Sequence, residues 1–287
     1  MIPGTLLALL LSDDVESFQT ETFLVAAAIL CLLSSANYVI NEYLDAPTDR
    51  YHPMKAKRAG AQGLLRFRYV AVLYLLLVVV SLTVAAHLGV FFFATSVAFL
   101  VMGVFYNVQP FRTKDRVYMD VLSEAINNPL RFLLGWFVVI HHAFPPSSIL
   151  IAFWMGGAFL MAIKRYAEYR QINDPERMAL YRRSFKFYNE ENLFLSSFFY
   201  ALNAAFFLGV FLIKYRIEYI LALPFIAVLF VWYLKIALKK DSAAQAPEKL
   251  YGEGPYLLYL LLVCSFLGFL TFADLPFLQV LVDPVIY

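Results

Sequence analysis

The sequence has few charged residues and very few cysteines. Only 15% of its 287 residues are charged, where soluble domains have about a quarter, and 62% are apolar. A soluble domain of this length has too small an interior to bury that much apolar surface. The cysteines, Cys31 and Cys264, both lie inside apolar runs, so a disulfide framework and a cysteine-ligated metal site are excluded. This composition predicts an all-α integral membrane protein that lies in the lipid bilayer.

Several functional motifs are also missing. The sequence contains no Walker sequence, no nucleophile elbow and no paired-cysteine motif, which leaves nucleotide-driven pumps and covalent hydrolases without support. No appended soluble domain and no low-complexity tract is apparent. The net charge of +2 says little about partners, and we expect no nucleic-acid partner.

Long apolar stretches are abundant instead. A bilayer presents about 30 Å of hydrocarbon, which a helix of about 20 residues spans. Eight stretches are long enough, or nearly so: 22–42, 67–87, 90–109, 118–140, 148–165, 192–213, 217–238 and 255–273. The shorter run Ile2–Leu11 is interpreted as the end of one more helix. We therefore predict about nine transmembrane helices in a single domain, 1–287.

The basic residues are concentrated in alternate connections. Most of the 23 lysines and arginines lie in four of them, 43–68, 110–117, 164–191 and 235–254. The other connections are short and contain only Lys214 and Arg216. Because cytoplasmic loops carry an excess of Lys and Arg, we predict that the four basic connections are cytoplasmic.

An acidic cluster closes the second apolar stretch. Asn41, Asp45 and Asp49 are spaced four residues apart, which would place them on one helical face. Pro47 disfavours a helical Ala46, so we predict that the helix ends near Asp45 and that Asp49 lies in the loop. Carboxylates at a helix C-terminus repel one another unless a cation joins them, and Mg²⁺ suits oxygen ligands and substrate phosphates. The alternative is a solvated acidic helix end.

Basic residues follow this cluster directly, at Arg50, Lys55, Lys57 and Arg58. One interpretation is that they only set the orientation of the membrane protein. However, orientation does not require cations this close to carboxylates. Acidic and basic groups in one loop suit a diphosphate whose charge is shared between Mg²⁺ and the protein.

A second polar cluster surrounds the start of the 118–140 stretch. Its members are Tyr106, Arg112, Lys114, Asp115, Arg116, Asp120 and Glu124. Asn127, Asn128 and Arg131 continue it into the apolar span, where ionisable groups are costly and usually face a cavity or a partner. Glu124 and Arg131 could form a buried structural pair.

A further element, Lys164-Arg165-Tyr166-Ala167-Glu168, ends the 148–165 stretch and opens a polar segment. Lys164 and Glu168 are four residues apart, so an ordinary helix-surface pair is the alternative to a functional role. The polar segment that follows, from Arg165 to Glu191, is a hypothetical lid because of its length and charge.

At these residues the chain resembles the UbiA superfamily of intramembrane prenyltransferases. The first motif of that family, Asn-Asp-x-x-Asp-x-x-x-Asp, is matched by Asn41, Asp45 and Asp49, with Glu42 in place of an aspartate. The second acidic motif resembles the stretch 106–120. The resemblance implies a helical bundle with a central cavity that opens to the cytoplasmic loops.

One branch of the superfamily is more similar than the others. The loop from Asp49 through His52, Lys55 and Arg58 to Gly63 resembles the first loop of the polyprenyl-phosphate (decaprenyl-phosphate) phosphoribosyltransferases. The 164–168 element resembles the Lys-Arg-x-x-Glu element of that branch. Ala59 replaces a proline that is usual there, and Asn127-Asn128-Pro129 is more similar to other branches.

The resemblance implies a mechanism and a set of site residues. Mg²⁺ would be held by Asp45, Asp49, Asn41 and Asp120, and Asp45, Asp49, Asp120 and Lys114 would be catalytic. Substrate would contact Asn41, Arg50, His52, Lys55, Arg58, Tyr106, Asn128, Lys164, Arg165 and Glu168. Departure of pyrophosphate would leave an electron-poor carbon that an acceptor attacks.

Two transferase reactions are compatible with this apparatus. In one, phosphoribosyl pyrophosphate donates a 5-phosphoribosyl group to a polyprenyl phosphate, and the sequence slightly favours this version. In the other, a prenyl diphosphate donates its lipid to an aromatic or other lipophilic acceptor. A non-catalytic lipid-binding or transport protein is the alternative of another class. The resemblance further implies the plasma membrane of a prokaryote, with catalytic loops in the cytoplasm.

Overall fold

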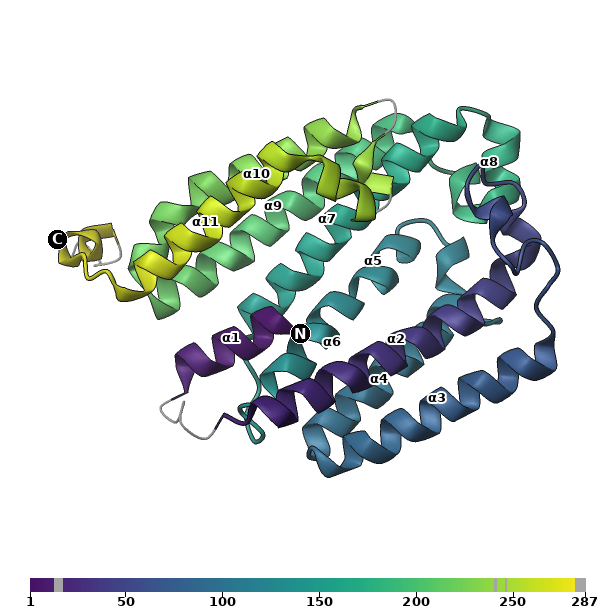
Figure 1. Ribbon diagram of the computed structural model, residues 1–287. Helices are drawn as coiled ribbons and strands as arrows, with labels where there is room; N and C mark the ends of the chain where they lie inside the picture. The colour runs from purple at the N-terminus through teal and green to yellow at the C-terminus, as the bar shows by residue number, and fades with distance from the viewer. Residues whose placement is uncertain (13–17, 240–241, 246, 282–287) are drawn as a thin grey trace. The chain divides into compact units, whose positions relative to one another are not determined.

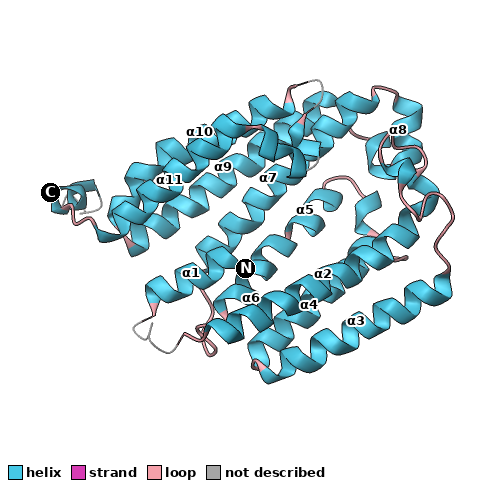
Figure 2. Ribbon diagram, in the orientation of Figure 1, coloured by secondary structure: helices cyan, strands magenta, loops and turns pink. Residues whose placement is uncertain are grey.

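A computed structural model describes residues 1–12, 18–239, 242–245 and 247–281 of the chain. Within these ranges every regular element is helical (Figure 2), as the composition predicts. The α-helices are α1 (Ile2–Leu11), α2 (Thr20–Asp49), α3 (Phe67–His87), α4 (Val90–Asn107), α5 (Met119–Ala125), α6 (Asn127–Trp136), α7 (Ser147–Ile172), α8 (Pro175–Tyr181), α9 (Glu190–Tyr215), α10 (Leu223–Ala237) and α11 (Gly254–Phe272).

Seven segments of the described chain are long and apolar enough to cross a membrane. They are α2, α3, α4, α7, α9, α11 and 217–237, in which the short 3-10 helix η4 (Ile217–Ala222) leads into α10. Two expected spans differ from these seven. Ile2–Leu11 forms a short apolar helix, and the predicted span 118–140 is divided into α5 and α6. The prediction of a multi-pass helical membrane protein is confirmed, and the count of nine is approximate.

The end of α2 differs from the sequence prediction. The helix continues through Pro47 to Asp49 instead of ending near Asp45. Proline removes one backbone donor, but in the last turn this breaks little of the helix. The Thr48 hydroxyl donates to the Asp45 carbonyl oxygen at 3.1 Å. As a result Asp45 and Asp49 lie one turn apart on the same helix, where the sequence interpretation had separated them.

The break between α5 and α6 has a local cause. Pro129 has no N–H to donate to the carbonyl of Ala125, four residues earlier. The side-chain amide of Asn128 donates to that carbonyl instead, at 3.1 Å. Asn127 likewise donates to the Glu124 carbonyl at 3.1 Å. The two asparagines therefore satisfy backbone groups that the change of direction leaves open, inside a region that is expected to lie in the membrane.

The chain divides into two compact units, and each is described here by itself. Unit 1 comprises Met1–Pro145 and Ile172–Asn189, and unit 2 comprises the remainder. In unit 1, α2 packs against α3 and α4, and α4 packs against α6 (Figure 1). Helices α1 and α6 approach very closely, because a Cβ atom added to Gly4 would lie 2.0 Å from the Phe132 carbonyl oxygen. Small residues permit such backbone contact between membrane helices.

Unit 2 is formed by α7, α9, α10, α11 and their short connections. Aromatic side chains join its helices: Phe159 of α7 contacts Phe230 of α10, with ring centroids 4.8 Å apart. Trp232 of α10 contacts Tyr259 of α11 at 5.6 Å. Division into two units does not test whether residues 1–287 form one domain, and the single domain stays a prediction.

Candidate active site

Charged side chains gather at one end of unit 1. They come from the last turn of α2, the loop that follows it, the 110–118 connection with its 3-10 helix η2 (Thr113–Asp115), and the segment 172–189. This segment, called the strap below, contains α8 and the 3-10 helix η3 (Arg183–Lys186). A small polar pocket is lined by Asp45, Thr48, Asp49, Arg112, Lys114, Asp115, Tyr181 and Arg182. The predicted carboxylates of α2 and the predicted Lys114 are therefore brought together.

Asp45 lies between two cations from the 110–118 connection. Its Oδ1 atom accepts a hydrogen bond from the Lys114 ammonium group and lies 3.2 Å from a guanidinium nitrogen of Arg112. Arg112 also contacts Asp115 at 3.0 Å. These cations offset the unfavourable position of a carboxylate at the C-terminal end of a helix dipole.

Lys114 is almost wholly buried, with 2% of its surface exposed. Besides Asp45, its ammonium group donates to the Asn107 Oδ1 atom at 2.7 Å, and the Asn41 amide donates to the same oxygen at 2.5 Å. Burial lowers the pKa of Lys114 to about 8, although Asp45 acts in the opposite direction. The predicted ligand Asn41 thus reaches the site through Asn107, at the end of α4.

Asp49 is held by the basic loop that follows it. Its Oδ2 atom lies 3.0 Å from a guanidinium nitrogen of Arg58. The loop is in turn fastened to α2, because the Gly60 N–H donates to Glu42 Oε1 at 3.2 Å. Glu42, which replaces an aspartate of the family motif, therefore helps to position the loop that carries the cations.

The strap covers the same loop. Lys55 donates to the Tyr181 hydroxyl, and Arg177 donates to the Tyr51 carbonyl at 2.7 Å. The predicted substrate ligand His52 is buried, and its Nδ1 atom accepts from the backbone N–H of Met54 at 3.2 Å. The structure therefore gives the His52 ring a role in shaping the turn.

Asp120 does not line the pocket that contains Asp45 and Asp49, although Arg182 of that pocket lies 3.8 Å from it. It is fully buried, and its two oxygens accept from the Tyr188 hydroxyl at 2.7 Å and the Ser184 hydroxyl at 3.1 Å. Both hydroxyls belong to the strap. Within the described residues, no group of three or more histidine, cysteine and acidic side chains is placed to hold a metal. The role of Asp120 as a further metal ligand stays a prediction, and in the structure its carboxylate is bonded to the strap.

Tyr106 also joins the strap to unit 1. Its hydroxyl donates to Glu124 Oε2 at 2.7 Å and accepts from the Arg182 guanidinium at 3.1 Å. Arg182 lies 3.8 Å from Asp120 as well. Tyr106 is thus linked to the pocket by its hydrogen bond from Arg182. Glu124, the possible partner of Arg131 in the sequence analysis, is bonded to Tyr106.

The remaining predicted residues do not line this pocket. Arg50 is exposed at the end of α2. Lys164, Arg165 and Glu168 lie on α7 in unit 2, and their part in the site stays a prediction. Arg165 and Glu168 are both 1% exposed and pair at 2.9 Å. Glu168 is buried against Arg165, so it does not lie on the helix surface as the alternative interpretation expected.

The carboxylates of α2 fit a hard divalent cation. Asp45 and Asp49 line one pocket, and each uses one oxygen for the cations described above. The second oxygens, Oδ2 of Asp45 and Oδ1 of Asp49, accept no hydrogen bond from the described part of the chain. Mg²⁺ is commonly bound by one or two carboxylates together with substrate phosphates, so this donor set suits Mg²⁺ bound with a phosphorylated ligand.

Sequence reasoning missed several members of the site. Asn107, Tyr181 and Arg182 were not predicted, although each contacts a predicted residue. A polar Asn107 at the end of an apolar run was the available signal for the first. For Tyr181 and Arg182 the neighbouring sequence holds no signal of a place in the site. They come from a distant part of the chain, since Arg182 and its partner Tyr106 are 76 residues apart in the sequence.

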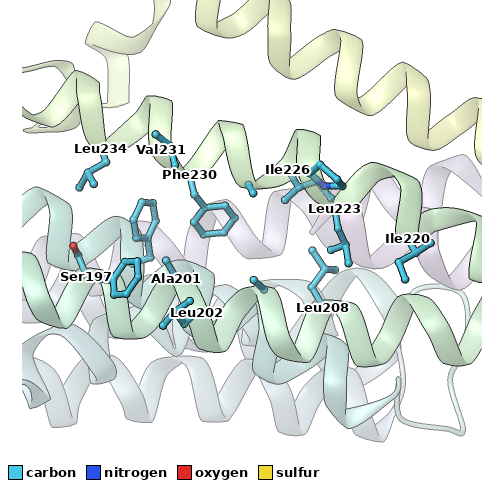
Figure 3. Close-up of a pocket in the computed structure, with 15 residues that line it drawn as sticks. Ser197, Ala201, Leu202, Leu208, Ile220, Leu223, Ile226, Phe230, Val231 and Leu234 are labelled. Carbon is cyan, nitrogen blue, oxygen red and sulfur yellow. The ribbon is translucent and has the colours of Figure 1, made fainter. Parts of the chain in front are cut away.

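Unit 2 contains an apolar groove of about 560 Å³ (Figure 3). It lies between α9 and α10, with Phe159 of α7 in its wall, and Ala201, Ile226 and Phe230 are among its lining residues. The one hydroxyl in the lining, that of Ser197, donates to the Phe194 carbonyl at 2.7 Å. The groove therefore offers only hydrocarbon contacts and carries no chemistry of its own.

Helices, carboxylates and buried cations together define a multi-pass helical membrane protein with a charged pocket at one end of unit 1. A family model identifies the family to which this protein belongs. Residues 1–252 match the UbiA prenyltransferase family, and the chain belongs to that family.

The chain is also similar to individual proteins. It is 31% identical over 148 residues to a decaprenyl-phosphate phosphoribosyltransferase of Mycolicibacterium smegmatis; the match covers 50% of this chain and 44% of that relative, which is less than half the relative's length. A UbiA homologue of Archaeoglobus fulgidus bound to DMAPP and Mg²⁺ has the same fold, with a TM-score of 0.69, 20% identity, and coverage of 96% of this chain and 98% of the other. The same homologue bound to GPP and Mg²⁺ gives a TM-score of 0.68 at 19% identity, with coverage of 92% and 97%.

Proposed function

We propose that the chain is a Mg²⁺-dependent membrane transferase that releases pyrophosphate, and that it transfers 5-phosphoribosyl from phosphoribosyl pyrophosphate to a polyprenyl phosphate. One observation carries the proposal: Asp45 and Asp49 lie a turn apart in one pocket, each with one oxygen on a cation and one oxygen available to a metal. Family membership and the relative from M. smegmatis support the reaction type.

The acidic and the basic residues of the pocket have different roles in this proposal. Asp45 and Asp49 would hold Mg²⁺, which supplies electrophilic stabilisation of the diphosphate when it is bound. Lys114 and Arg112 lie within reach of the same oxygen of Asp45, so they are placed to neutralise the leaving pyrophosphate. Burial of Lys114 keeps water away from its charge, which strengthens its attraction for an anion.

The surplus of cations supports the phosphoribosyl donor. Beyond Lys114 and Arg112, the pocket region contains Arg58 and Lys55 from the loop and Arg182 from the strap. Phosphoribosyl pyrophosphate carries a 5-phosphate in addition to its diphosphate, and a second phosphate requires cations beyond those that neutralise the first. The polyprenyl chain of the acceptor would lie among the spans, and the site would open to the cytoplasm of a prokaryote through the basic loops.

A second candidate is prenyl transfer from a prenyl diphosphate to an aromatic or other lipophilic acceptor. The observation that favours it is the likeness of the fold to a homologue bound to DMAPP and Mg²⁺. The same pocket would bind the diphosphate, and the loop cations would then have no second phosphate to bind. The two candidates therefore differ in what Lys55 and Arg58 do.

The test is pyrophosphate release by the purified protein in detergent with Mg²⁺. Phosphoribosyl pyrophosphate with polyprenyl phosphate is compared with prenyl diphosphates with aromatic acceptors. We expect release with the first pair, abolished by Asp45→Asn and by Asp49→Asn but unchanged by Asp274→Asn, which alters an exposed carboxylate just after α11 in unit 2. Release with the second pair alone would refute the phosphoribosyl assignment. Lipid binding without release by any pair would favour the non-catalytic alternative.

A further inference from the structure

Arg131 lies at the depth of the hydrocarbon in unit 1. The central carbon of its guanidinium group lies 5.6 Å from the centroid of the Phe99 ring. Phe99 is 1% exposed and lies near the middle of α4, which is one of the candidate membrane spans. A permanent positive charge is therefore placed where the bilayer is least polar.

The charge has no counter-ion among the residues that the structure describes. Within them the Arg131 side chain makes no ion pair and no hydrogen bond; it contacts the Phe99 ring, and the N-terminal ammonium group of Met1, a like charge, repels it. Glu124, the carboxylate that the sequence suggested as its partner, instead accepts from the Tyr106 hydroxyl at 2.7 Å. An ionisable residue inside a membrane protein is costly, and where it is retained it usually serves a ligand or a transported species.

Two neighbouring amides are also incompletely satisfied. Asn127 precedes Arg131 by four residues on α6, so the two side chains share a face of the helix. The buried Oδ1 atom of Asn127 accepts no hydrogen bond within the described chain. Asn37 of α2 donates to the Phe99 carbonyl at 3.2 Å, and its own buried Oδ1 atom also lacks a donor. Both unpaired asparagine atoms are hydrogen-bond acceptors, so Arg131 is the group of this set that can bind an anion.

This polar group is connected to the pocket by α4 itself. Asn107, which accepts from Lys114, lies eight residues after Phe99, which is about 12 Å along the helix. A molecule with a hydrophobic body and an oxyanion at Arg131 would therefore lie within unit 1, on the membrane side of the pocket.

We propose that Arg131 binds the oxyanion of a lipophilic substrate, a carboxylate or a phosphate carried on a hydrophobic body. This assignment deepens the proposed function, on which it rests, because it identifies the part of the protein that recognises the acceptor. The chemistry of a guanidinium group accommodates both oxyanions. A polyprenyl phosphate would supply the phosphate, and an aromatic acceptor would supply the carboxylate.

The first test compares Arg131→Met, Arg131→Lys and the control Arg68→Gln, which removes an exposed cation at the start of α3. Steady-state turnover is measured against acceptor at saturating donor, together with the thermal unfolding midpoint. We expect Arg131→Met to raise the acceptor KM at least about tenfold, with donor KM unchanged and the midpoint equal or higher. Arg131→Lys should retain part of the acceptor affinity. An unchanged acceptor KM in Arg131→Met overturns the proposal, and so does a lower midpoint without a change in KM.

The second test does not depend on turnover. Dodecyl phosphate and a 4-alkylbenzoate are added separately to the protein in non-ionic detergent, without Mg²⁺ or donor, and thermal stabilisation is measured. We expect one or both to stabilise the wild-type chain and the Arg68→Gln control but not Arg131→Met; the effective probe identifies the source of the oxyanion. The proposal is overturned if a probe stabilises the wild type and Arg131→Met equally, or if no probe stabilises either protein. Arg131→Gln replaces Arg131→Met if the latter does not fold. A chain that binds a probe through Arg131 but releases no pyrophosphate would refute the proposed function and leave this assignment standing.

Discussion

Asp120→Ala tests whether this carboxylate anchors the strap or binds metal. The substitution removes the acceptor for the hydroxyls of Tyr188 and Ser184, which lie 2.7 Å and 3.1 Å from its two oxygens. Hydrogen bonds to a charged group contribute about 1.5–3 kcal/mol each, so the loss of two weakens the attachment of the strap by about 3 kcal/mol or more. That change corresponds to a roughly 100-fold increase in local opening.

The assay is hydrogen–deuterium exchange of the metal-free protein, followed in peptides that cover residues 172–189. We expect amides of α8, such as the Arg182 N–H that donates to the Met178 carbonyl at 2.9 Å, to exchange roughly 100-fold faster in Asp120→Ala. Peptides from α3 provide the internal reference and should not change. Tyr188→Phe removes one of the two hydroxyls, so its effect should have the same direction and be smaller.

The opposite result is equally informative. If Asp120 were a metal ligand, Asp120→Ala would raise the Mg²⁺ concentration required for half-maximal activity while exchange in the strap of the metal-free protein stayed the same. That pattern would refute the anchoring role. Faster exchange in the strap with an unchanged Mg²⁺ requirement per folded molecule would establish it.

Two further predictions concern packing and the basic loop. Gly4→Ala places a Cβ atom 2.0 Å from the Phe132 carbonyl oxygen, so it should reduce the free energy of unfolding by about 3 kcal/mol and lower the unfolding midpoint. The control Gly268→Ala has nothing within 4 Å of its new Cβ atom and should leave the midpoint unchanged. Equal midpoints for the two variants would contradict the close crossing of α1 and α6. Glu42→Asp withdraws the carboxylate from the Gly60 N–H and should raise the donor KM several-fold. Glu42→Gln keeps an acceptor oxygen at this place and should have the donor KM of the wild type. A higher donor KM in Glu42→Gln than in Glu42→Asp would exclude the positioning role.

The fold was predictable because its signal is local. Apolar runs depend only on the residues within each stretch, and they indicated a multi-pass helical protein correctly. The distribution of lysine and arginine predicts the orientation in the membrane, which stays a prediction. The end of α2 was predicted incorrectly because the rule about proline treats the helix interior, whereas Pro47 lies in the last turn. The break at Ile126 was missed for a related reason: Pro129 was visible, but the amide of Asn128 compensates for it and lets the chain continue.

The site was predictable only where its residues are close in the sequence. Asp45, Asp49 and Arg58 belong to one motif, and the structure brings them to one place. The partners of Asp120 could not be predicted from the motif, since Tyr188 lies 68 residues further along the chain. A carboxylate in an acidic motif has the same appearance whether it faces a metal or two hydroxyl groups, and tertiary contacts alone distinguish the two.

Charge pairing explains why Arg131 differs from the basic residues of the pocket region. Arg58, Arg112 and Lys114 each lie against an aspartate of the pocket region, so in the absence of ligand their charges are balanced by the protein. Sequence spacing suggested the same arrangement for Arg131 and Glu124, seven residues apart and therefore on one helical face. The break between α5 and α6 separates the two residues, and the Tyr106 hydroxyl occupies the carboxylate. Within the described residues this cation of α6 has no counter-ion, and the proposed oxyanion of a lipophilic substrate would balance its charge.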